Sequence, residues 1–154
     1  ANAGSGRHAD MNHYGRLVVM MVISFLVMYV LMYAMVDRFA NVYGSVNQFY
    51  MAGLMTAPMA ILELALMGSM YQDKRMNVAI LVVAGIVLLG SWFAIRTQAG
   101  VGDREFVRSM IPHHAGAILM CKQNKLQDPE LQRLCANIIA SQQAEIELMK
   151  AKLQ

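Results

Sequence analysis

Long apolar runs separated by short charged segments dominate the first two thirds of the chain. Residues 17–36 contain no charged side chain, residues 49–71 contain one, Glu63, and residues 78–95 contain none. A helix needs about 20 apolar residues to cross the hydrocarbon core of a bilayer, so the pattern predicts three transmembrane helices. Three buried core helices of a soluble protein are the alternative, but too little polar sequence remains to cover them.

Beyond residue 100 the pattern changes to that of two amphipathic helices. Asp103 is a candidate cap for a first helix that ends near Asn124, and Pro112 inside it predicts a kink or a restart. Residues 128–130 (Asp-Pro-Glu) supply an N-cap, a first-turn proline and a first-turn acid for a second helix. The predicted fold class is all-α, with a polar N-terminal arm at 1–16, a three-helix transmembrane domain at 17–96 and an antiparallel two-helix hairpin at 101–154.

Composition supports a membrane protein and argues against other classes. The chain is 57% hydrophobic and 15% charged, with a net charge of +3. It has no basic stripe interleaved with aromatic residues, which excludes nucleic acid as a partner. It also has no glycine-rich phosphate loop, no arrangement of nucleophile, histidine and acid, and no CxxC motif. We therefore predict a binding protein embedded in the lipid bilayer, and not an enzyme.

The positions of lysine and arginine predict the orientation in the membrane. The N-terminal arm carries Arg7 and Arg16, and the second loop carries Lys74 and Arg75, whereas the first loop carries only Arg38. Because cytoplasmic loops are enriched in these residues, we expect the N-terminus and the second loop inside the cell. Three crossings then place the C-terminal hairpin outside, although the cations that follow the third span oppose this orientation: Arg96, Arg104 and Arg108.

Soft metal ligands gather in the first helix of the hairpin. Residues 109–121 contain two thioethers, two imidazoles and a thiol, on Met110, His113, His114, Met120 and Cys121. Thioether and thiolate select Cu(I), and imidazole binds copper in either oxidation state. The alternative is an amphipathic helix whose methionines and histidines only pack.

The residue pattern of this stretch resembles that of a bacterial copper-binding helical-hairpin family. The family pattern is Phe, three residues, Met-Ile-Pro-His-His, two residues, Ala-Ile, one residue and Met, and it falls on Phe106, residues 110–114, Ala117, Ile118 and Met120. Its second half falls on residues 128–131, Ile138, Ile139, Gln143, Glu145, Ile146 and Met149. The resemblance covers about residues 101–154, and the first hundred residues look like the membrane-anchored subtype. It implies a ferritin-like four-helix bundle made of two hairpins, which suits a hairpin too small to bury a core alone.

Folding the hairpin about residues 127–128 gives an approximate register. Met110 comes level with about Ile146, and His114 comes level with about Gln142. Met110, His114 and Met149 can therefore converge on one ion, with Gln143 or Glu145 orienting an imidazole from behind. Adjacent histidines point 100° apart on a helix, so we expect His113 to serve another position or a neighbouring subunit.

Cys121 and Cys135 face each other in this register. Three interpretations stay open: a disulfide in an oxidising compartment, shared thiolate ligation of Cu(I), and two buried inert thiols.

Ten of the fifteen methionines lie in the first two apolar runs. A methionine-lined helix interface is one explanation, because Met is a flexible filler of packing gaps. The other is a ladder of thioethers that passes Cu(I) along the membrane, similar to eukaryotic copper transporters, with Glu63 as a mid-bilayer carboxylate. The candidate ladder is Met28, Met32, Met51, Met55, Met59 and Glu63.

The sequence thus predicts a copper-binding protein of the bacterial inner membrane whose hairpin lies in the periplasm. We expect it to form a homo-oligomer and to sequester Cu(I) or hand it to a copper-accepting protein, in support of copper tolerance or delivery. A Cu(I) transporter that uses the methionine ladder is the alternative. A second copper site on the N-terminal arm, at His8, Asp10, Met11 and His13, competes with a simple polar leader.

Overall fold

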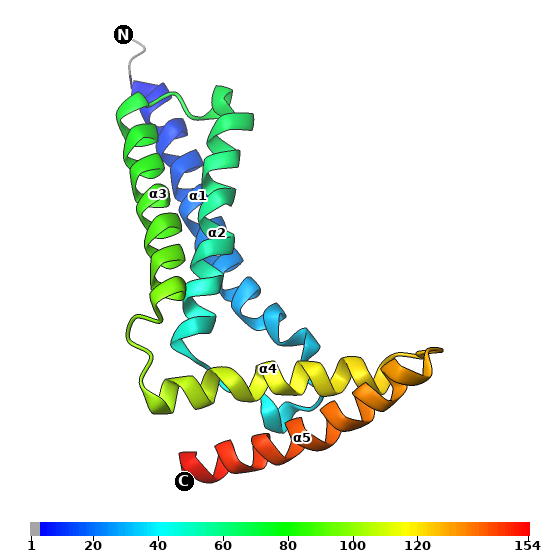
Figure 1. Ribbon diagram of the computed structural model, residues 1–154. Helices are drawn as coiled ribbons and strands as arrows, with labels where there is room; N and C mark the ends of the chain where they lie inside the picture. Colours follow the sequence, from blue (N-terminus) through cyan, green and yellow to red (C-terminus); the bar gives the residue numbers. More distant parts are fainter. Residues whose placement is uncertain (1–3) are drawn as a thin grey trace. The chain divides into compact units, whose positions relative to one another are not determined.

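The computed structural model describes residues 4–154, with side chains from residue 12 onward, and within this range the chain forms helices and no strands. The long helices are α1 (Gly4–Leu31), α2 (Val46–Leu66), α3 (Lys74–Thr97), α4 (Asp103–Gln123) and α5 (Pro129–Leu153) (Figure 1). Three short 3-10 turns are η1 (Met32–Met35), η2 (Phe39–Asn41) and η3 (Gly68–Met70). Residues 4–16 of the predicted N-terminal arm thus belong to helix α1, and the side chains of His8, Asp10 and Met11 lie outside the described residues.

Three helices in the described chain are long and apolar enough to cross a membrane. They span Asn12–Met35, Val46–Leu66 and Lys74–Thr97, close to the three predicted runs. The chain divides into two compact units, one made of residues 1–30 and 49–99 and the other of residues 31–48 and 100–154. The sequence boundaries had assigned residues 31–48 to the transmembrane domain, whereas they group with the hairpin.

One end of the membrane unit is closed by a small polar and aromatic cluster. Tyr14, Leu17 and Tyr71 are buried together, and the two tyrosine rings lie 5.3 Å apart. The Tyr14 hydroxyl donates to Oδ1 of Asn77 and accepts from the backbone N–H of Asp73. Because the Asp73 carboxylate also caps α3 through two backbone N–H groups, this cluster ties the start of α3 to α1.

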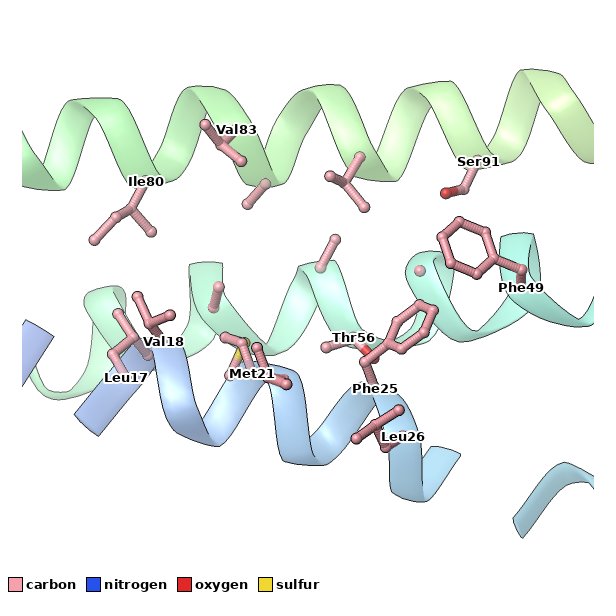
Figure 2. A pocket seen from close by; sticks show the side chains of 16 residues that line it. Leu17, Val18, Met21, Phe25, Leu26, Phe49, Thr56, Ile80, Val83 and Ser91 are labelled. Carbon is pink, nitrogen blue, oxygen red and sulfur yellow. The ribbon is translucent and has the colours of Figure 1, made fainter. Parts of the chain in front are cut away.

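Between α1, α2 and α3 lies an apolar cavity of about 510 Å³. Its lining is aliphatic and aromatic except for the thioether of Met21 and the hydroxyls of Thr56 and Ser91, and Figure 2 shows Phe25 and Phe49 near one end. Helix α2 presents small residues inward: Ala52, Gly53, Thr56, Ala57 and Ala60 are buried. A Cβ on Gly53 would lie 2.9 Å from Oγ of Ser91, so glycine permits the approach of α3 at this level.

The methionines of α2 do not line that interior. Met51 and Met55 are exposed on the single chain, and Met59 is half-buried. In α1 the helix ends at Leu31, and Met32 belongs to a 3-10 turn, so the helical stripe through Met28 stops there. The 3.6-residue period that defined the stripe does not apply in a 3-10 turn.

Glu63, which we had expected near the middle of its span, lies toward the C-terminal end of α2. It is in the last turn of α2, where its Oε1 accepts a hydrogen bond of 3.2 Å from the Tyr71 hydroxyl. The difference arises because the second apolar run, residues 49–71, extends beyond its helix, which begins at Val46 and ends at Leu66.

In the second unit, α4 and α5 form an antiparallel hairpin (Figure 1). Their core consists of Ile111, Ala115, Ile118, Ile146 and Met149. Helix α4 continues through Pro112, so of the two predicted effects of this proline the restart is absent. The N-cap of α4 is Gly102, with Asp103 as a first-turn acid. At the start of α5 the Asp128 carboxylate accepts from the N–H groups of Glu130 and Leu131, as the sequence predicts.

The first loop, residues 36–45, packs on this hairpin with η1 before it and the start of α2 after it. Arg108 Nε donates to the carbonyl of Gly44 over 2.8 Å, and Asn47 Nδ2 donates to Ser109 Oγ over 3.0 Å. Val36 and Tyr43 contact the hairpin core. The hairpin therefore does not stand alone: a loop from the first half of the chain covers part of it.

Candidate metal centre

His114 is a polar residue of α4 that is buried in the hairpin. Only 8% of it is exposed, and its Nε2 lies 2.5 Å from Oε2 of Glu145 on α5. Of the two residues expected to orient an imidazole, Glu145 is the one that contacts it. The pairing differs by three residues from the predicted level of Gln142.

The Glu145 contact determines which ring nitrogen of His114 is free. A carboxylate only accepts hydrogen bonds, so Nε2 donates, and in the neutral imidazole Nδ1 keeps its lone pair. Nδ1 is buried and has no hydrogen-bond partner in the described part of the chain. A histidine whose second nitrogen donates to a carboxylate is the usual arrangement of a metal ligand.

Two thioethers lie one helical turn from this pair. Met110 precedes His114 by four residues on α4, and Met149 follows Glu145 by four residues on α5, which brings both toward the same level of an antiparallel hairpin. Met149 belongs to the buried core, and Met110 packs against that core. The three predicted ligands Met110, His114 and Met149 are thus gathered in one region.

His113 and Met120 occupy a different side of α4. Both are exposed, and the His113 ring centroid lies 6.3 Å from that of His114 with the rings steeply inclined. The five candidate ligands therefore divide into an inner set, Met110, His114 and Met149, and an outer pair, His113 and Met120. Among the side chains that the structure describes, residues 12–154, no group of three or more His, Cys, Asp or Glu residues is arranged for a metal ion.

Cys121 and Cys135 form a disulfide near the tip of the hairpin, with their Cα atoms 5.2 Å apart. Of the three open interpretations, this is the one that the structure has. The sulfurs are then not thiolates, so they stand outside the inner and outer ligand sets. The bond closes the hairpin between α4 and α5.

The sequence pattern did not predict that turn η1 and the first loop pack against helix α4. Met35 lies against Gly116 on α4, and Asn47 and Glu105 help to hold the loop in place. Residues 32–35 were assigned to a membrane span by hydropathy, which carries no information on a contact with residue 116. The polar stretch 37–48, longer than a tight turn requires, was the only available indication.

Comparison with known proteins places the chain in a family. The family described as "Domain of unknown function (DUF305)" matches residues 93–153, which include both helices of the hairpin. "Uncharacterized protein L153" of Acanthamoeba polyphaga mimivirus is 34% identical over 143 residues, covering 89% of this chain and 90% of the viral protein. The chain belongs to the DUF305 family. The viral relative extends over the membrane unit as well as the hairpin, and no solved structure matches the chain.

Proposed function

We propose that this member of the DUF305 family is a membrane-anchored protein that binds Cu(I) in its hairpin and either sequesters it or passes it on. The observation that carries the proposal is the buried Nδ1 of His114, which has no hydrogen-bond partner among the described side chains, residues 12–154, while Nε2 is held by Glu145. Leaving such an atom unpaired costs about 1–3 kcal/mol, and a metal ion would remove that cost.

The ligand chemistry favours Cu(I) over harder ions. Met110 and Met149 offer soft thioether sulfur about one helical turn from the His114–Glu145 pair, and soft ligands select Cu(I). Magnesium and calcium require oxygen ligands, and zinc sites use thiolate, imidazole or carboxylate. The site supplies too few of these.

The proposed cellular compartment and oligomeric state rest on the disulfide, the loop charges and the exposed leucines of α5. The Cys121–Cys135 disulfide suits an oxidising compartment, which agrees with the periplasmic orientation inferred from Lys74, Arg75 and the N-terminal arginines. We therefore place the protein in a bacterial inner membrane. Exposed leucines on α5 support pairing of two hairpins in a homo-oligomer, with Cu(I) passed to an accepting protein: Leu131, Leu134 and Leu148.

The transporter alternative receives less support. Met51 and Met55 point away from the interior of the single chain, so a methionine path would have to form between several copies. A sequestering or delivering function needs only the hairpin.

Competition for Cu(I) tests the proposal on the full-length protein in nanodiscs. With a chromogenic Cu(I) chelator as competitor, His114→Gln and Met149→Leu should each weaken binding about tenfold or more. Glu147→Gln is the matched control, because Glu147 is an exposed acid on the same helix. Unchanged affinity in both ligand variants would overturn the assignment.

A further inference from the structure

Turn η1, which leads into the first loop, touches α4 at Gly116, the one glycine of that helix. A Cβ built on Gly116 would lie 3.6 Å from the carbonyl oxygen of Met35 and 3.9 Å from its Cβ. The absence of a side chain at Gly116 therefore lets turn η1 rest on α4, with the Met35 side chain beginning at this level. About half of Met35 remains exposed, so its side chain is accessible to a ligand from solvent.

The outer ligands of α4 flank the same position. At 100° per residue, His113 and Met120 lie within about 20° of each other and within about 60° of Gly116. At 1.5 Å per residue, His113 lies about 4.5 Å before Gly116 along the axis and Met120 about 6 Å after it. Both side chains are exposed. Along the axis of α4, Met35 thus contacts the helix at a level between the imidazole of His113 and the thioether of Met120.

We infer that Met35, His113 and Met120 form a second Cu(I) site at the contact between turn η1 and helix α4. The inference rests on the proposed function only in taking Cu(I) as the metal. Two thioethers and one imidazole make a soft three-ligand set of the kind that Cu(I) accepts. None of these ligands belongs to the inner set of Met110, His114 and Met149.

The site formed by Met35, His113 and Met120, called the outer site, is exposed to solvent, and its function therefore differs from that of the more buried inner set. Its ligands lie in contact with solvent, whereas His114 and Met149 are buried. The ring of His113 is 6.3 Å from that of His114, a short step for an ion passed between neighbouring ligands. The outer site therefore acts as the place where Cu(I) is exchanged with other carriers before or after the inner site holds it.

Titration of the full-length protein in nanodiscs with Cu(I) tests the second site. Two classes of binding are expected. Met35→Leu, which keeps the volume and removes the sulfur, should weaken one class about tenfold and leave the other unchanged. Met76→Leu removes an exposed thioether from the membrane unit and is the matched control.

A double-mutant cycle shows whether Met35 and His113 act on the same ion. If they share it, Met35→Leu combined with His113→Gln should be little worse than either change alone. Oxidation supplies an independent measurement: Cu(I) should slow conversion of Met35 and Met120 to the sulfoxide, and should not affect Met76.

The outcomes separate the two proposals. Loss of the outer class in Met35→Leu with an intact inner class supports the second site. Unchanged binding and unchanged oxidation of Met35, while His114→Gln still weakens the inner class, would overturn the second site alone. If His114→Gln has no effect but Met35→Leu and His113→Gln do, the inner site fails and the outer one stands.

Discussion

Removing the disulfide should loosen the hairpin without unfolding the membrane helices. Cys121 and Cys135 are 14 residues apart in sequence, so the bond closes a loop of about 15 residues. Chain-entropy arguments assign about 3 kcal/mol to such a loop. The double change Cys121→Ala and Cys135→Ala should therefore raise the open population of α4 and α5 about 100-fold, at 1.4 kcal/mol per factor of ten.

Hydrogen exchange in nanodiscs, read peptide by peptide, measures this opening. Amides of α4 and α5 should exchange about 100-fold faster in the double variant, while those of α2 and α3 stay unchanged, because the bond lies within the hairpin unit. Treating the natural protein with a phosphine reductant should have the same effect and should not alter the double variant. A change below about threefold, or equal acceleration in α2, would refute the reasoning.

Three further predictions follow from the packing and topology. Ile111→Ala should destabilise the hairpin by about 2–5 kcal/mol, seen as a lower midpoint in denaturant, because Ile111 is fully buried among Ile118 and Ile146. Replacing Met51, Met55 and Met59 with leucine should leave expression and hairpin copper binding intact and should not reduce Cu(I) uptake by sealed vesicles; loss of uptake would favour a transporter. A phosphatase reporter active only outside the cytoplasm should work after Gln154 and fail in the loop at Lys74, and the reverse result would put the hairpin in the cytoplasm.

Hydropathy and helix caps were enough to predict most of the fold. The predicted spans differ from the observed ones by a few residues, and the second hairpin helix begins at Pro129 because Asp128 caps it. The grouping of residues 31–48 with the hairpin was missed, since it depends on contacts such as Arg108 with Gly44, which are 64 residues apart. Hydropathy and capping patterns within a short window carry no information on contacts between residues so far apart in the sequence.

The pairing of the two hairpin helices was predicted less accurately than their bounds. Sequence register placed His114 opposite Gln142, whereas Glu145 faces it. An offset of three residues is about one helical turn, which a small change in the connecting loop or in the crossing of two helices is enough to produce. The contact of Met35 with Gly116 was not predicted, because hydropathy assigns Met35 to a membrane span and carries no information on its contacts.

The central claim is that Nδ1 of His114 binds Cu(I). Nitrogen NMR of the full-length protein with ¹⁵N-labelled histidine reads this atom directly. On addition of Cu(I), Nδ1 of His114 should move from the frequency of an unprotonated ring nitrogen to that of a metal-bound one. Nε2 should stay protonated against Glu145. Bound Cu(I) with the Nδ1 resonance of His114 unmoved would contradict the account.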